Sequence, residues 1–194
     1  DGYRDDSGTY LALASWIAET AQRIVKPGGL CFVFQAQQRL RQTWALFPED
    51  SRLFAAVKNF VQIRQTAVQY AYDPVIFWQK PGKLLSSYRG RDWHIANTAN
   101  TLNRGMDKVD FHECPRPLDT CQYIVGNFAP PGGVVCDFFM GSGTTAVAAK
   151  TTGRHWLGFE LRAGVAEKAR QRVAIAQTPL LLPAAPEQSA MFGD

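Results

Sequence analysis

VVCDFFMGSGTT, residues 134–145, places a short apolar run, an acidic residue and a glycine-rich turn in direct succession. The apolar run predicts a buried strand over 134–138. Gly141 and Gly143 let the backbone approach a ligand and adopt conformations closed to residues that carry a side chain. A helix predicted over 144–152 turns its free N–H groups toward this turn. Strand, turn and helix together predict a ligand-binding loop in an α/β protein.

A second acidic residue stands at the end of the next predicted strand, 155–160. Glu160 follows Gly143 by 17 residues, a position from which a carboxylate can accept both hydroxyl groups of a ribose. A nucleoside-triphosphate loop requires a lysine where this chain has Thr144, which excludes that ligand. A glycine turn that only joins a strand to a helix is the alternative without a ligand.

Two adenosine-containing ligands remain for this loop. The dinucleotide pattern G-x-G-x-x-G/A is matched by Gly141, Gly143 and Ala146. However, the 34 residues that follow Glu160 are too few for the second nucleotide-binding half of a dinucleotide fold. S-adenosylmethionine has no pyrophosphate, and Asp137 suits its ammonium group or fixes the loop. The pattern therefore favours S-adenosylmethionine over a nicotinamide dinucleotide.

Helices and strands alternate along the rest of the chain, which predicts an α/β fold with a largely parallel sheet. The continuous apolar run LCFVF at 30–34 is typical of a strand buried on both faces of such a sheet. Residues 81–110 show no periodicity, and a region of that length inside a compact domain is usually functional or mobile. The other predicted elements are a helix that begins near Thr9, helices over 36–47, 118–128 and 162–176, and strands over 60–70 and 72–80.

Composition restricts the class of protein. With 194 residues, of which 46% are hydrophobic, the chain has enough apolar residues for a core, and no apolar run reaches the ~18 residues of a membrane span. A formal charge of +4 is compatible with nucleic-acid binding. The four cysteines form no C-x-x-C pair and the three histidines are scattered, so we expect no metal site and a reducing cytoplasm. Cys31 and Cys136 lie in apolar runs and are expected to be buried.

Several motifs resemble those of one enzyme family. DFFMGSGTT at 137–145, GR at 153–154 and GFE at 158–160 are similar to the D-P-F-x-G-S-G-T-T…G-R…G-x-E signature of DNA amino-methyltransferases, which methylate adenine N6 or cytosine N4. HECPRPL at 112–118 resembles the H-P-x-x-K/R-P-L segment of the permuted, β-type order, and YDPVIFWQKPG at 72–82 resembles another strand of the family. The resemblance covers roughly residues 10–176. It implies a Rossmann-like S-adenosylmethionine-dependent methyltransferase fold, with a mostly parallel sheet and helices on both faces.

The chain departs from the family pattern at three places. Phe138 and Glu113 stand where the family has proline. More seriously, the catalytic tetrapeptide D/N/S-P-P-Y/F/W is absent, because neither DPVI at 73–76 nor PPG at 130–132 fits it. In the permuted order the tetrapeptide precedes the helix that begins near Thr9. We therefore expect it before Asp1 and assign no catalytic residue within the chain; a degenerate, inactive relative is the alternative.

The resemblance also implies roles for individual residues. Glu160 is expected to hold the ribose, and Arg116 and Pro117 to lie near the methionine end of the cofactor, where a cation suits the carboxylate. The alternative for Arg116 is an ordinary surface ion pair. The residues expected to line the S-adenosylmethionine pocket are Asp137, Phe139, Gly141, Ser142, Gly143 and Thr144.

Residues 81–110 lie where the family keeps its target-recognition region. The stretch 80–116 contains seven basic and four acidic residues, a local charge of +3. Arginines suit phosphates and asparagines suit base edges, whereas the alternative is a solvated loop in which Trp93 belongs to the core. The expected DNA contacts are Arg89, Arg91, Trp93, Asn97, Asn100 and Arg104.

The sequence thus predicts a methyltransferase domain over 1–176 and a flexible tail over 177–194. We expect a site-specific DNA methyltransferase of a bacterial, phage or mobile-element restriction-modification system, acting on double-stranded DNA and more readily on adenine N6 than on cytosine N4. A non-catalytic DNA-binding relative and, last, an NAD-type oxidoreductase are the alternatives. Gln188 to Phe192 in the tail resemble the Gln-x-x-hydrophobic-Phe peptide that docks on bacterial sliding clamps.

Overall fold

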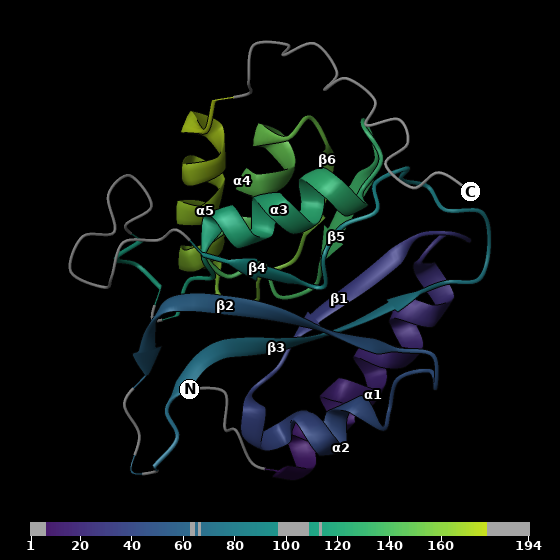
Figure 1. Ribbon diagram of the computed structural model, residues 1–194. Helices are drawn as coiled ribbons and strands as arrows, with labels where there is room; N and C mark the ends of the chain where they lie inside the picture. The colour runs from purple at the N-terminus through teal and green to yellow at the C-terminus, as the bar shows by residue number, and fades with distance from the viewer. Residues whose placement is uncertain (1–6, 63–64, 66, 97–108, 113, 178–194) are drawn as a thin grey trace.

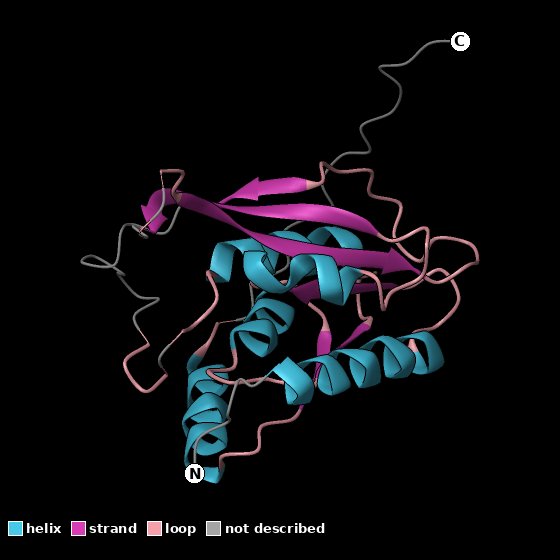
Figure 2. Cartoon of the chain, turned by 90° about the horizontal axis from the view of Figure 1, so that it is seen from below, coloured by secondary structure: helices cyan, strands magenta, loops and turns pink. Residues whose placement is uncertain are grey.

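The computed structural model describes residues 7–62, 65, 67–96, 109–112 and 114–177. Its strands form two separate sheets (Figures 1 and 2). In the larger sheet β3 runs antiparallel to both β1 and β2, and β2 runs parallel to β4. In the smaller sheet β5 and β6 are parallel. The strands are β1 (Leu30–Phe34), β2 (Arg52–Gln62), β3 (Tyr70–Gln79), β4 (Trp93–Ile95), β5 (Val134–Asp137) and β6 (His155–Gly158), and the larger sheet has the order β1-β3-β2-β4.

Helices cover both faces of the larger sheet, as Figure 1 shows. Val75 and Ile76 are consecutive residues of β3 and point to opposite faces, because side chains alternate along a strand. Val75 packs with Ile124 of α3, and Ile76 packs with Ala18 of α1. The helices are α1 (Ser7–Ile24), the 3-10 turn η1 (Gln37–Arg39), α2 (Leu40–Trp44), α3 (Leu118–Phe128), α4 (Thr144–Thr151) and α5 (Ala163–Ile175).

Helix α3 joins the two sheets. Its Ile124 belongs to the core of the larger sheet, whereas Cys121 and Val125, also buried, pack against Ala148 of α4 and Val135 of β5. A helix that buries apolar side chains on two sides must lie between the elements that cover them. The smaller sheet and α4 are therefore held against the larger sheet through α3.

The predicted α/β class and the placement of helices on both faces are confirmed, but the larger sheet is mixed rather than mostly parallel. A continuous apolar run such as β1 carries no information on strand direction. The five side chains of β1 are half-buried, which corrects the expectation of a strand buried on both faces. The strand predicted over 60–70 is also displaced, because β2 occupies Arg52–Gln62. Ala55 and Ala56 have little intrinsic preference for a strand, and their pairing with β3 determines the structure there.

Among the described residues, β5 pairs only with β6 and β1 only with β3, so each strand has one unpaired edge. Side chains of β5 alternate between exposed and half-buried, and Val134 is 70% exposed. Cys136 is exposed as well, which corrects the expectation that it is buried. None of the described helices combines the length and apolar character that a membrane span needs.

Candidate functional site

The glycine-rich turn lies between the end of β5 and the start of α4. Gly141 has a φ of +50° and Gly143 a φ of +81°, the left-handed region that glycine enters without strain. The Asp137 carboxylate accepts a hydrogen bond from the Phe139 amide at 2.9 Å, and the Met140 amide donates to the Phe159 carbonyl at 2.8 Å. The predicted loop conformation is thus held from both neighbouring strands.

Glu160 lies directly against this loop. Because β5 and β6 are parallel and Asp137 is in register with Gly158, the carboxyl ends of both strands meet at one edge. The Glu160 carboxylate accepts hydrogen bonds from the amides of Gly141 and Arg162, each at 3.0 Å. Oε2 retains a second lone pair for a ligand donor, whereas Oε1 also lies 3.5 Å from Nε of the Arg162 guanidinium. The structure therefore brings together the carboxylate and the glycines that the sequence assigned to one site.

Ser142 and Thr144 connect the loop to helix α5. Both are buried, and their hydroxyl groups lie 3.2 Å apart. Arg172 of α5 donates to the Ser142 carbonyl at 3.1 Å and to the Thr144 hydroxyl at 3.0 Å. Their side chains thus brace the loop against α5. Sequence reasoning missed Arg172, because a basic residue within a helix gives no signal of a partner 28 or 30 positions away.

Apolar side chains surround the exposed side of the loop. Phe139 and Leu161 are exposed, and Phe138 makes ring contacts with Trp16 of α1 at 5.2 Å and with Phe159 at 6.2 Å between centroids. A hollow of about 500 Å³ lies between β6 and α5, and its lining includes Phe159, Glu160 and Leu161. The site thus combines a glycine-rich loop, a carboxylate next to it and exposed apolar side chains beside both. Such a combination of polar and apolar groups fits an adenosine.

The segment before α3 runs from this loop to the larger sheet. His112 lies against Gly141, since a Cβ on that glycine would be 2.8 Å from His112 Nε2. Four residues later, Arg116 contacts the Asp73 carboxylate at 3.3 Å and lies over the Phe34 ring at 4.8 Å. Pro117 is the N-cap residue of α3. The ion pair that the sequence left as the alternative for Arg116 is therefore present.

Three of the expected DNA-contacting residues lie near β4, at the edge of the larger sheet. Arg91 and Trp93 are exposed, and the Arg91 guanidinium lies 4.8 Å from the Trp93 ring centroid. Arg89 turns back onto the carbonyls of its own loop, at 3.2–3.3 Å. The other expected contacts and the tail peptide, namely Asn97, Asn100, Arg104 and Gln188 to Phe192, lie outside the described residues.

Cys121 is a buried thiol. Burial raises the pKa of the Cys121 thiol to about 12, so that this group is a neutral thiol at physiological pH. Within the described ranges, no group of three or more His, Cys, Asp or Glu residues is placed to hold a metal ion. Arg154 likewise has a structural role, donating to the carbonyls of Gly126 (2.7 Å) and Ala129 (2.8 Å) at the end of α3.

A protein-family model matches part of the chain. Residues 86–171, which include the segment before α3, the glycine loop and Glu160, match the model of the family described as DNA methylase. Over this stretch, which is less than half of the chain, the sequence is similar to that family. The resemblance to DNA amino-methyltransferases that the motifs indicated is thereby confirmed.

Individual DNA methylases match parts of the chain. The type II methyltransferase M1.MboII of Moraxella bovis is 35% identical over 75 residues, 38% of this chain and 29% of that protein. The type II methyltransferase M.HindIII of Haemophilus influenzae is 26% identical over 142 residues, 62% of this chain and 46% of that protein. The chain thus spans less than half the length of these relatives.

The fold of DNA methylases is matched over most of the chain. The crystal structure of the M1.HpyAVI–SAM complex superposes with a TM-score of 0.71 at 21% identity, covering 87% of this chain and 85% of that one. At this identity the match concerns the fold. It confirms the expected Rossmann-like methyltransferase fold, with the mixed larger sheet described above.

Proposed function

We propose that this chain binds S-adenosylmethionine and double-stranded DNA as part of a site-specific DNA amino-methyltransferase of a restriction-modification system. The observation that carries the proposal is the contact between the Glu160 carboxylate and the Gly141 amide at 3.0 Å, which puts a ribose acceptor and a glycine cradle into one site. Adenine N6 is the preferred target and cytosine N4 the alternative, on the sequence resemblance alone. A DNA substrate implies that the protein acts in the compartment that holds the DNA, the bacterial cytoplasm.

Each part of the site has a task in cofactor binding. Asp137 fixes the start of the loop through the Phe139 amide, so that the backbone of 139–143 is presented in one conformation. Glu160 accepts the ribose hydroxyl groups with its remaining lone pairs. Phe139 and Leu161, both exposed, cover the adenine by apolar contact. Arg116 faces the carboxylate at the methionine end.

When bound, S-adenosylmethionine would supply an electrophilic methyl group for the amino nitrogen of the base. The chain's own residues hold and orient the reactants. No residue of the chain is assigned to the amino group, because the sequence contains no D/N/S-P-P-Y/F/W tetrapeptide. We therefore propose methyl transfer only for polypeptide that contributes such a tetrapeptide.

Arg91 and Trp93 are the proposed DNA contacts among the described residues. A guanidinium stacked on an exposed indole is held in place without being neutralised, which leaves its charge for a phosphate. The target base must leave the duplex stack before its amino group can be reached, at a cost of a few kcal/mol. Contacts to phosphates position the duplex while this happens.

Calorimetric titration tests the proposed function. We expect S-adenosylmethionine to bind the folded chain with micromolar affinity and NADH to bind far more weakly. The double variant Gly141→Trp plus Glu160→Ala is expected to lose binding. The control Glu167→Ala, which removes an exposed carboxylate of α5 paired with Arg170 at 3.4 Å, is expected to retain it. Preference for NADH, or no binding by folded wild-type chain, would contradict the proposal.

The sequence resemblance leaves a second candidate open, a non-catalytic relative that binds cofactor and DNA without transferring a methyl group. The two candidates differ in one assay. Transfer of tritiated methyl groups to duplex DNA is expected when a D-P-P-Y segment is fused before Asp1, if the cofactor half is intact. Cofactor binding without transfer in that fusion would support the non-catalytic relative.

A further inference from the structure

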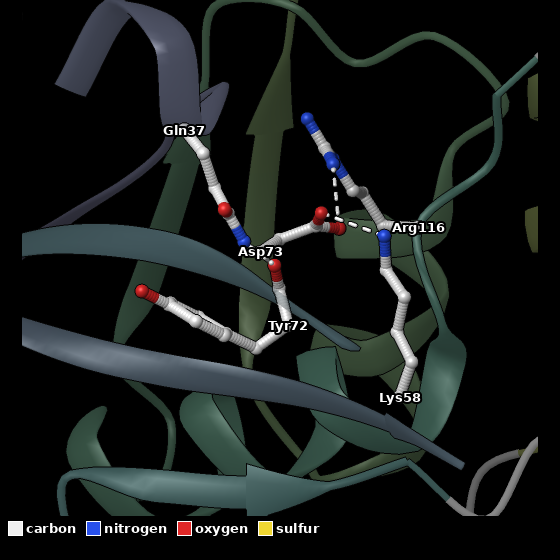
Figure 3. A network of polar contacts seen from close by, with 5 residues as sticks. All are labelled: Gln37, Lys58, Tyr72, Asp73 and Arg116. Atoms are coloured by element: carbon white, nitrogen blue, oxygen red, sulfur yellow. Dashed lines mark hydrogen bonds and ion pairs between the residues drawn. The ribbon is translucent and has the colours of Figure 1, made fainter. Parts of the chain in front are cut away.

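Asp73 lies on β3 between two cations that come from different elements. Its carboxylate contacts Lys58 Nζ of β2 at 2.7 Å through Oδ1 and the Arg116 guanidinium at 3.3 Å through Oδ2. Figure 3 shows both cations converging on this carboxylate. The Lys58 side chain is only 9% exposed, whereas that of Arg116 is 40% exposed. One member of the cluster is therefore internal and another faces solvent.

The charges of this cluster do not balance. Lys58 and Arg116 contribute two positive charges and Asp73 one negative charge, so one positive charge is in excess. Lys58 is nearly buried and lies 2.7 Å from the carboxylate. It therefore interacts with Asp73 more strongly than Arg116 does, because the attraction between opposite charges is largest where water is excluded. The excess charge therefore resides mainly on Arg116, the exposed member. A ligand carboxylate beside Arg116 would restore neutrality.

Two contacts fix the direction of Arg116. Its guanidinium edge meets Asp73, and its plane lies over the ring of Phe34 at the end of β1, 4.8 Å from the centroid. A guanidinium has five N–H donors, and the Asp73 contact uses one of them. Because the carboxylate and the ring already restrict the guanidinium, Arg116 loses little further side-chain entropy when it binds an anion.

The cluster is tied to the glycine loop through a short segment. His112 lies against Gly141. Arg116 follows His112 by four residues, so the Cα atoms of His112 and Arg116 are within roughly 14 Å of each other. The Asp73 contact thus anchors one end of the segment whose other end touches the proposed cofactor loop. This arrangement gives Asp73 an effect on the site without contact to the ligand.

We propose that Asp73 is a positioning residue, which holds Arg116 toward the carboxylate at the methionine end of S-adenosylmethionine. The proposal rests on the proposed function. It makes a specific claim, because only ligands that carry the amino-acid group should sense Asp73. 5′-Methylthioadenosine has the same adenosine and thioether but no amino-acid group, and is the reference ligand.

The test is titration of both ligands against wild-type chain and the Asp73→Asn variant. Asp73→Asn removes a negative charge near the ligand carboxylate, which alone would favour binding, but it also releases Arg116 from its fixed direction. We expect the loss of the aligned, charge-assisted contact from Arg116 to dominate, so that S-adenosylmethionine binds roughly tenfold more weakly and 5′-methylthioadenosine is unchanged. Arg116→Ala is expected to show the same selectivity, and the double variant to bind no more weakly than Arg116→Ala. The control Asp92→Asn breaks an exposed pair with Arg52 at 3.7 Å and is expected to change neither affinity.

Several outcomes overturn the inference. Equal weakening of both ligands by Asp73→Asn would make Asp73 a structural residue, and additive losses in the double variant would separate it from Arg116. If the wild-type chain bound both ligands equally well, the proposed contact between Arg116 and the ligand carboxylate would be refuted. Binding of neither ligand would refute the proposed function itself, a distinct result. If Asp73→Asn does not fold, Asp73→Glu, which keeps the charge and shifts the carboxylate by one methylene, is expected to give the same selectivity.

Discussion

Replacing Gly141 with alanine tests whether the segment before α3 closes over the glycine loop. The residue has a φ of +50°, and a Cβ there would be 2.8 Å from His112 Nε2. The left-handed conformation costs an L-residue about 1–2 kcal/mol, and overpacking against a held side chain costs about 1–3 kcal/mol. The His112 ring is held, since its Nδ1 accepts a hydrogen bond from the Cys114 amide at 3.3 Å. We therefore expect Gly141→Ala to lower the free energy of unfolding by about 2–5 kcal/mol.

Gly153→Ala is the matched control. Gly153 has a φ of +73°, and a Cβ there would meet nothing within 4 Å, so the substitution adds only the conformational cost of about 1–2 kcal/mol. Both substitutions reduce the entropy of the unfolded chain equally, and that effect cancels in the comparison. The difference between the two variants thus isolates the contact with His112.

Urea unfolding followed by tryptophan fluorescence measures these free energies. In the double variant His112→Ala plus Gly141→Ala the collision is gone, so we expect a coupling of about 1–3 kcal/mol in favour of the pair. Equal costs for Gly141→Ala and Gly153→Ala, or additive costs in the double variant, would refute the placement of His112 over the loop.

Three further predictions concern stability and DNA binding. Arg154→Ala leaves the last carbonyls of α3 without their donors and is expected to lower the free energy of unfolding by about 2–4 kcal/mol. Arg170→Ala, at an exposed position, is expected to lower it by under about 0.5 kcal/mol. Similar urea midpoints for the two variants would contradict this prediction. Because the folded pKa of Cys121 is about 12 and its ordinary value 9.0, the stability from this thiol is complete below pH 9 and falls by about 1.4 kcal/mol per pH unit above it; Cys121→Ala should flatten that decline in urea titrations. Arg91→Ala is expected to reduce the slope of log K against log salt for duplex DNA by about 1 in anisotropy titrations, and an unchanged slope would remove Arg91 from the DNA contacts.

Local signals explain why most helices were predicted closely. Helix α3 occupies Leu118–Phe128, the predicted range, because Pro117 precedes it and a proline-rich turn at 130–131 follows it. Helix α4 begins directly after Gly143, whose left-handed conformation ends the loop. In each case the residues that define the boundary are neighbours in sequence.

Pairing between distant strands was not predictable in the same way. The strand predicted over 72–80 includes Asp73 and Pro74, although proline interrupts most strands. In the structure both residues lie within β3. The Pro74 carbonyl accepts a hydrogen bond from the Gln35 amide at 2.8 Å, so its nitrogen, which has no hydrogen, faces the same side, one residue beyond the last pair with β1. Where β1 ends decides whether proline is tolerated, and the local sequence of β3 does not contain that information.

The candidate site shows the same division. Glycines and acids of the loop were found from their spacing, whereas the partners that hold them come from afar: Arg172 reaches the loop from α5, and Asp73 reaches Arg116 from β3. Long cationic side chains find acceptors through the tertiary fold, and a single sequence gives no sign of which acceptor each will meet. The contact of Asp73 became visible only once β3 and the segment before α3 were placed side by side.

Helix α3 is the element that makes one site of these separate motifs. Thr120, fully buried on this helix, lies 3.2 Å from His94 of β4, next to the proposed DNA contact Trp93. Cys121 packs toward α4 and thus toward the glycine loop, and the residue before Pro117 contacts Asp73. A shift of α3 would therefore move the DNA edge, the loop and the Arg116 cluster together. For this reason a substitution that loosens the end of α3, such as Arg154→Ala, should weaken ligand binding as well as stability.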